Sequence, residues 1–256
     1  MKNILHSLLI VSLFLGLPLQ SNAVDHTLFD SVLNKYTDGG YFDYSSYVED
    51  PESRQRLDRY RSQMSQVQLK ELDGKEKLAY WLNLYNASTI HLIAKNYPLE
   101  SIKDLGGWFG SPFDKKFIPT TKGELSLNTI EHDIIRPDFN EPRIHFALVC
   151  AARSCPPLRF EAYTAEKLDE QLENQARQFI ASDKNRFVIQ NDQLTLKLSS
   201  IFYWYGEDFG GESGLANYLK KYLDDRGKTL IGQGNYSISY LDYDWSLNQA
   251  PGPYQR

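Results

Sequence analysis

The stretch from residue 143 to residue 157 constrains this chain more than any other, because it holds both cysteines of the protein, Cys150 and Cys155. An apolar run of strand length ends on Cys150, a short polar turn follows, and two prolines come directly after Cys155. The run predicts a buried β-strand. In a regular strand His145 would lie on the opposite face from Cys150 and roughly 16 Å away, so it could not act as a base for Cys150.

The first 23 residues have the composition of a secretory signal peptide. Lys2 precedes an almost wholly apolar segment from residue 4 to 19, and Ser21 and Ala23 are the small residues typical of a cleavage site. The segment is shorter than the roughly 20 apolar residues that a membrane span needs. We therefore expect cleavage before Val24, no membrane span in the mature chain, and an exported protein that is periplasmic or secreted.

The remaining chain is predicted to form one domain, residues 24–250, followed by a loose tail, residues 251–256. Its length is sufficient for one sizeable core. The net charge of −5 and the lack of basic clusters argue against nucleic acid as a partner. The 17 tyrosines and 4 tryptophans suit an aromatic binding cleft or a tyrosine-rich core. No pattern specifies a cofactor or an oligomeric state.

Mixed helical and strand patterns predict an α+β domain in which several helices pack on a small sheet. The strongest helix runs from about residue 75 to residue 96, where Asp73 and Glu76 form a capping box at its start. Further helices are predicted at residues 25–36, 51–64, 127–136, 164–180, 201–208 and 215–223, hairpins at 116–126 and 186–198, and a late strand at 236–245.

Polar side chains interrupt the apolar faces of two predicted helices. Asn83, Asn86 and His91 lie on the long helix, which we expect to be buried on most sides. A buried polar side chain requires a partner, so these three either satisfy a core network or reach a functional group. His132 lies toward the rim of the helix at 127–136, where an imidazole can face a cleft.

Cys150 fits the requirements of a nucleophile better than Cys155. It lies where an apolar run gives way to a turn, a position open to solvent and to backbone N–H groups. Pro156 restricts Cys155 to extended geometry and removes one donor that could stabilise an oxyanion. The base for Cys150 would come from elsewhere in the fold, and His132 and His91 are the candidates.

Three other interpretations of the cysteine pair stay open. In an oxidising compartment a Cys150–Cys155 disulfide can simply close the turn. A metal site is weakly indicated, because neither a Cys-x-x-Cys nor a His-Glu-x-x-His spacing is present, and no metal is expected. A redox dithiol lacks its usual two-residue spacing.

Three motifs, at residues 80–91, 125–136 and 144–157, together resemble the domain-of-unknown-function 547 family, which is common in exported bacterial proteins and also found in plants. The family pattern includes Asn86, His91, His132 and Cys150. The resemblance implies a fold that has been likened to the papain-type cysteine hydrolases, although the local papain cysteine signature is missing and both candidate bases precede the cysteine. We expect it to cover residues 27–245.

These observations lead to a first hypothesis, an exported Cys-His hydrolase or acyl-transferase acting on amide or thioester bonds. Cys150 would be the nucleophile and His132 the base, with His91 as the alternative base. Asn86 or Asn83 would orient the imidazole or donate to the oxyanion. The substrate would be a peptide or another envelope component.

The second hypothesis is a non-catalytic envelope binding domain in which Cys150 and Cys155 form a structural disulfide. Its aromatic surface would bind a glycan, a peptide or a partner protein. The polar groups of the long helix would then only satisfy hydrogen bonds within the core.

Under the first hypothesis, by contrast, Cys155 and Arg136 have supporting roles around the site.

Overall fold

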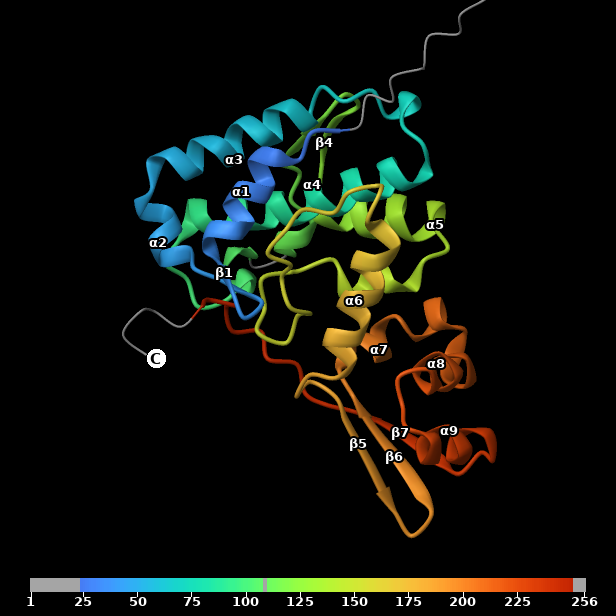
Figure 1. The fold of residues 1–256 in the computed structure, drawn as a ribbon. Coiled ribbons are helices and arrows are strands. Elements are labelled where there is room, and N and C mark those ends of the chain that lie inside the picture. Colours follow the sequence, from blue (N-terminus) through green and yellow to red (C-terminus); the bar gives the residue numbers. More distant parts are fainter. Residues whose placement is uncertain (1–23, 108–109, 251–256) are drawn as a thin grey trace, which may run out of the picture.

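The long helix α4, Gly74–Asn96, lies at the centre of the larger part of the protein (Figure 1). The computed structural model describes residues 24–107 and 110–250, and the predicted signal peptide and tail lie outside them. The predicted capping box is present, because Asp73 and Glu76 each accept the backbone N–H of the other. Every residue from Leu78 to Ile90 is buried, as the sequence pattern predicts.

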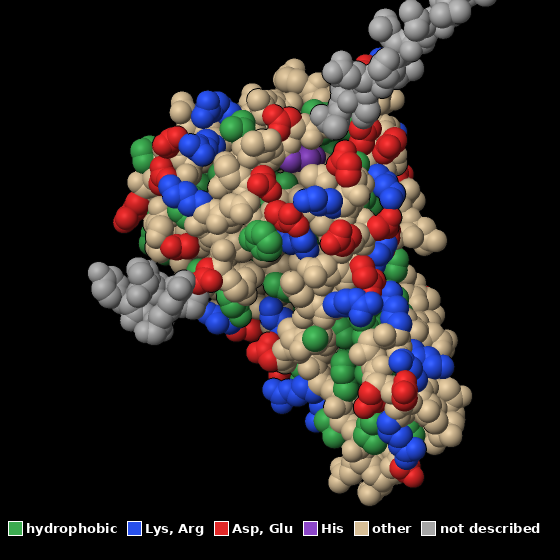
Figure 2. Space-filling model, in the orientation of Figure 1, with side chains coloured by type: hydrophobic (Ala, Val, Ile, Leu, Met, Phe, Trp, Pro, Cys, Tyr) green, Lys and Arg blue, Asp and Glu red, His purple; other side chains and the backbone are tan. Residues whose placement is uncertain are grey.

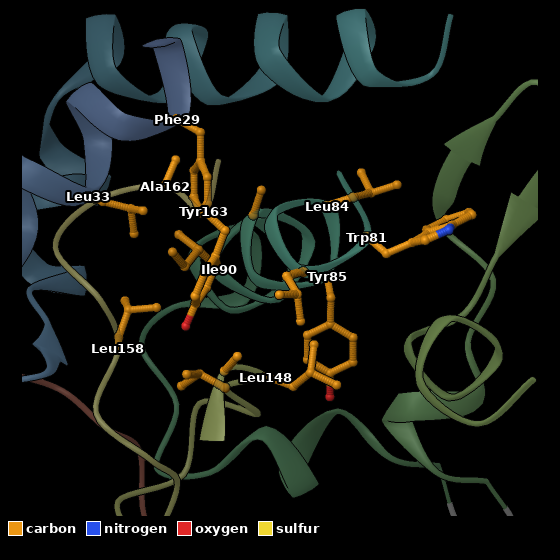
Figure 3. Packing of buried hydrophobic residues seen from close by; sticks show 14 of the residues in the cluster. Phe29, Leu33, Trp81, Leu84, Tyr85, Ile90, Leu148, Leu158, Ala162 and Tyr163 are labelled. Carbon is orange, nitrogen blue, oxygen red and sulfur yellow. The ribbon is translucent and has the colours of Figure 1, made fainter. Parts of the chain in front are cut away.

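Helices near the N-terminus cover one side of α4. The helix α3, Pro51–Met64, packs on α4 and also on α1, Thr27–Tyr36. Figure 3 shows Phe29 of α1 and Leu84 and Tyr85 of α4 within this first hydrophobic core. The shorter elements of this part are β1 Thr37–Asp38, β2 Tyr41–Phe42, α2 Tyr44–Glu49, η1 Leu69–Glu71, η2 Ile102–Leu105 and η3 Pro112–Asp114.

A second, smaller core lies around a three-stranded sheet, shown in the lower part of Figure 1. Strand β6, Gln193–Leu198, pairs antiparallel with β5, Arg186–Gln190, and parallel with β7, Tyr236–Tyr240. Asn191 and Asp192 have positive φ angles and form the tight turn of the predicted hairpin. The helices of this part are α6 Leu168–Ile180, α7 Ser200–Trp204, η6 Gly206–Phe209, α8 Gly211–Lys220 and α9 Asp225–Gly232.

The segment before Cys150 connects the two cores, but it is not the predicted strand. Residues Pro142–Phe146 form a 3₁₀ helix, η5, and the chain then runs to Cys150 without strand pairing. Side-chain amides take the place of a neighbouring strand. The Asn86 amide donates to Ala147 O and accepts from Val149 N–H, both at 2.9 Å, so buried backbone groups are satisfied without a sheet.

Other predictions are confirmed or shifted at their boundaries. The hairpin of β3, Ile118–Thr120, and β4, Gly123–Leu125, is confirmed. The helix predicted at 127–136 is a π-helical segment, η4 Thr129–Ile135, followed by α5 Arg136–Asp138. The late strand, predicted to run to residue 245, ends at Tyr240. The helix α9 was not predicted from the sequence. The α+β fold class is confirmed, whereas the likeness to papain-type hydrolases stays a prediction.

Two further features concern the charge of the surface and the apolar character of the helices. On the face shown in Figure 2, acidic and basic side chains are interspersed and no extended basic surface is present. Within residues 24–107 and 110–250, none of the helices has the length and apolar character needed to cross a membrane.

The turn between β1 and β2 braces the chain just after Cys155. Gly40 has φ +85°, its carbonyl accepts the N–H of Leu158 at 2.9 Å, and a Cβ added to Gly40 would overlap the ring of Pro157. We predict that Gly40→Ala lowers the free energy of unfolding by on the order of 3 kcal/mol in urea denaturation, through overlap and backbone strain together.

The neighbouring glycine provides the control for this prediction. Gly39 also has a positive φ, +58°, but its added Cβ would meet no atom nearer than 4.0 Å. Gly39→Ala should therefore cost only about 1 kcal/mol of backbone strain. Equal losses for the two variants would show that contact with Pro157 does not matter.

Candidate functional site

A cavity of about 210 Å³ lies between the two hydrophobic cores and contains both cysteines. Besides tyrosines, four other polar or titratable side chains line it, namely Asn128, Glu131, His132 and His145. Most of the remaining wall is aromatic, from Tyr85, Phe113, Trp204, Tyr205, Tyr243 and Trp245. Side chains from α4, η4, η5, α7 and the segment after β7 thus meet around one small space.

A larger hollow of about 360 Å³ lies elsewhere, beside His26 at the start of α1. Burial lowers the pKa of His26 to about 4, and its ring lies 2.7 Å from the Tyr60 hydroxyl. Neither cysteine nor His132 lines this hollow. We place the candidate site in the smaller cavity because the reactive groups gather there.

Cys150 and Cys155 form a disulfide in this structure, across Cα atoms 6.3 Å apart. The Cys150 N–H donates to the sulfur of Cys155 at 3.0 Å, and the hydroxyl of Tyr243 lies 3.3 Å from each sulfur. Cys155 is buried at 2% exposure, whereas Cys150 is partly exposed. Cys150 is therefore the sulfur that an incoming molecule would reach first.

The residue after Cys150 has an unusual backbone conformation. Ala151 is fully buried and has φ +62°, the left-handed region that alanine rarely adopts. Its carbonyl accepts the N–H of Asn248 at 2.9 Å, and Arg153 N–H donates to Ser246 O at 2.7 Å. Contacts with the C-terminal segment thus hold a strained turn directly next to the accessible sulfur.

His145 is held by an ion-paired carboxylate. Its Nε2 lies 2.7 Å from Asp208, and Arg136 donates to both oxygens of Asp208 at 2.7 and 2.8 Å. Hydrogen bonding from Arg136 lowers the pKa of Asp208 to about 2, so the carboxylate is ionised and Nε2 carries the donated hydrogen. The imidazole also stacks on Tyr205, with 3.9 Å between the ring centroids.

The other ring nitrogen of His145 is free. Burial lowers the pKa of His145, which favours the neutral ring at neutral pH. With the hydrogen on Nε2, the Nδ1 atom has an unshared electron pair. Nδ1 is buried and has no hydrogen-bond partner in the described part of the chain. This nitrogen can accept a proton.

His132 has the opposite arrangement. Its Nδ1 lies 3.1 Å from Nη1 of Arg136, and a guanidinium can only donate. Nδ1 therefore accepts, and in the neutral ring the hydrogen is on Nε2. His132 is exposed at the rim of the cavity, as predicted, but it offers an N–H donor there rather than a free acceptor.

Glu131 is the buried carboxylate of the cavity, with an exposure of 7%. The Tyr85 hydroxyl donates to it at 3.3 Å. Burial raises the pKa of Tyr85, Tyr205 and Tyr243, and the negative charge of Glu131 adds to each shift. Glu131 therefore lies among three phenols, and none of the ion pairs in the described residues includes it.

The structure gives the predicted asparagines a positioning role. Both amide atoms of Asn86 are bound to the backbone of residues 147 and 149, and both of Asn83 to the backbone of Tyr163. Neither lines the cavity. Both amides fix chain segments on α4, and because neither side chain lines the cavity, the structure does not place them beside the cysteines.

Of the remaining predicted site residues, Arg136 lies next to the cavity and His91 does not. Arg136 adjoins the cavity by binding both Asp208 and His132. His91 does not line it and instead pairs with Asp58 at 3.0 Å, and burial lowers its pKa to about 4. Of the residues named from the sequence, the structure thus brings Cys150, Cys155, His132 and Arg136 together.

Sequence reasoning missed His145, Glu131, Asp208 and Tyr243. The exclusion of His145 assumed a regular strand, and because η5 is a 3₁₀ helix that assumption was wrong. Glu131 adjoins His132 in the sequence, and that pairing was a usable signal. Asp208 and Tyr243 come from distant segments, and no local pattern marks them.

Taken together, the fold and the cavity define an α+β domain with a cysteine pair, two histidines and a buried carboxylate in one aromatic cavity. A family described as "Protein of unknown function, DUF547" matches residues 69–180, which confirms the resemblance seen in the sequence, over a shorter range than expected. The match includes α4, η4 and the cysteine turn but not Asp208 or Tyr243. Comparisons with curated proteins and with solved structures gave no match.

The role of Asn86 leads to a prediction for stability. Asn86→Ala would leave the Ala147 carbonyl and the Val149 N–H buried without partners. We expect the free energy of unfolding in urea to fall by about 3 kcal/mol.

The control is Asn34→Ala, because Asn34 is exposed and hydrogen bonds only to Asp30 within α1. Its unfolding free energy should change by less than about 0.5 kcal/mol. A loss of that small size for Asn86→Ala would contradict the positioning role.

Proposed function

We propose that this protein is an exported, thiol-dependent hydrolase or acyl-transferase acting on amide or thioester bonds, with Cys150 as its nucleophile. One observation carries the proposal. The more accessible sulfur of the chain lines a single small cavity with an imidazole whose Nδ1 is free and with a second imidazole that presents an N–H. A nucleophile, a proton acceptor and a donor are the groups that acyl transfer requires.

The disulfide must be reduced before this chemistry can begin. A thiol reductant attacks the sulfur of Cys150, the S–S bond breaks, and Cys155 leaves as a thiolate. The Cys150 N–H and the Tyr243 hydroxyl, which contact the Cys155 sulfur, would stabilise that thiolate. A second reductant thiol then displaces Cys150 from the mixed disulfide, so two reductant thiols become one disulfide and both cysteines are free.

We assign the general base to His145 rather than to His132. The Nδ1 of His145 would take the proton of the Cys150 thiol, and Asp208 would stabilise the resulting imidazolium through Nε2. The Nδ1 of His132 is already occupied by Arg136, so His132 would instead donate from Nε2 to the oxyanion. His91, which pairs with Asp58, has no part in this assignment.

The reaction would proceed in two steps. The Cys150 thiolate attacks the carbonyl carbon of the substrate, the C–N or C–S bond breaks, and His145 returns its proton to the leaving amine or thiol. Water or another acceptor then attacks the thioester on Cys150 and His145 takes the proton of the acceptor. The C–S bond to Cys150 breaks, the acyl product leaves, and Cys150 departs as the thiolate beside the protonated His145.

The alternative is a non-catalytic envelope binding domain, and the observed Cys150–Cys155 pairing favours it. In that case the disulfide permanently closes the turn formed by residues 150–155. The two functions differ in whether the folded protein can present a reactive Cys150 thiol.

The test is reduction of the folded protein followed by iodoacetamide labelling and peptide mapping. Cys150 should alkylate faster than glutathione at pH 7, because a base in the cavity raises the thiolate fraction. The reduced protein should also hydrolyse phenyl thioacetate. His145→Gln should slow both reactions at least about tenfold, and His132→Gln should lower turnover more than alkylation.

The matched control is His91→Gln, which should leave both rates unchanged in protein whose fold is verified by circular dichroism. A disulfide that resists dithiothreitol until the protein unfolds would overturn the enzyme and support the binding domain. Alkylation of Cys150 at the rate of glutathione, without thioester hydrolysis, would also overturn it.

A further inference from the structure

The carboxylate of Glu131 forms no ion pair with a Lys, Arg or His in the described part of the chain. Its hydrogen bonds come from phenols, because it accepts the Tyr85 hydroxyl at 3.3 Å and also hydrogen bonds with Tyr205. A buried carboxylate is unfavourable unless a cation or several donors compensate for its lost hydration.

The charged groups near Glu131 are already occupied. Arg136 binds Asp208 through two hydrogen bonds, so these two charges balance each other. The buried ring of His145 hydrogen bonds to Asp208 through Nε2. Burial lowers the pKa of this ring, so it is neutral at neutral pH. Two carboxylates, those of Glu131 and Asp208, thus share the one guanidinium of Arg136, and this excess of negative charge attracts a cation from outside the chain.

The walls of the cavity suit an organic cation. Trp204, Tyr243 and Trp245 pack against one another with ring centroids 4.6 to 5.8 Å apart, and Tyr85, Tyr205 and Phe113 complete the aromatic lining. The faces of such rings attract ammonium groups. The chain itself gives an example, because Nζ of Lys103 lies 3.9 Å from the centre of the Trp245 ring.

We infer that the cavity binds an alkylammonium group, as in the side chain of lysine, between the carboxylate of Glu131 and the rings of Trp204 and Tyr243. The volume of about 210 Å³ suits a head group of this size together with part of its alkyl chain. In the proposed reaction this group would belong to the substrate and would position the acyl bond at Cys150. That role rests on the proposed function, whereas the binding does not.

The test is calorimetric titration of the full chain with butylammonium in phosphate buffer, with butan-1-ol as the neutral ligand of similar shape. We expect butylammonium to bind at least about tenfold more tightly than butan-1-ol. Glu131→Gln, which keeps the shape of the side chain, should remove this preference. Trp204→Leu, at an exposed position on the cavity rim, should weaken butylammonium binding several-fold.

The matched control is Glu124→Gln, an equal charge change at an exposed position of β4, which should leave the preference unchanged. Equal affinity for the two ligands, or a preference that survives Glu131→Gln, would overturn the inference. If butylammonium binds but the Cys150 thiol is not reactive, only the proposed reaction is contradicted. If the thiol is reactive but butylammonium does not bind preferentially, only the ammonium site is contradicted.

Discussion

The hydrogen bonds between the Asn86 amide and the backbone of residues 147 and 149 are the interaction on which the site depends. They replace a strand partner for a segment that crosses from one hydrophobic core to the other. Because α4 begins at a capping box and is buried over three turns, it is a rigid support for this amide. The position of Cys150 is therefore set by a polar contact in the core and not by sheet register.

A single guanidinium organises the charges around the cavity. Arg136 keeps Asp208 ionised, and Asp208 in turn fixes the hydrogen of His145 on Nε2. The same side chain donates to Nδ1 of His132 and fixes the hydrogen of that ring on Nε2 as well. In both rings the hydrogen is on Nε2, yet one ring leaves Nδ1 free in the buried wall and the other presents N–H at the rim. Through its contacts with Asp208 and His132, Arg136 thus favours an acceptor nitrogen on one histidine and a donor N–H on the other.

The sequence predicted those features whose causes are local. The capping box of α4 and the Asn191–Asp192 turn depend on neighbouring residues, and both were predicted correctly. The strand before Cys150 was predicted wrongly because apolar runs do not reveal that Asn86, about 60 residues earlier, satisfies the backbone. The same error removed His145 from consideration. Asp208 and Tyr243 reach the cavity only through the packing of the second core, which no sequence spacing encodes.

A structural disulfide would explain the pairing of Cys150 with Cys155 but not the features that surround it. Three features are each unfavourable for stability: the left-handed Ala151, the Nδ1 of His145, which has no hydrogen-bond partner among the described residues, and the buried carboxylate of Glu131, which forms no ion pair among them. All three lie in or beside the cavity that both cysteines line. Selection for stability alone would remove such features one by one. Their position beside an accessible sulfur fits the reactive Cys150 that we propose, because functional sites commonly retain features that are unfavourable for stability.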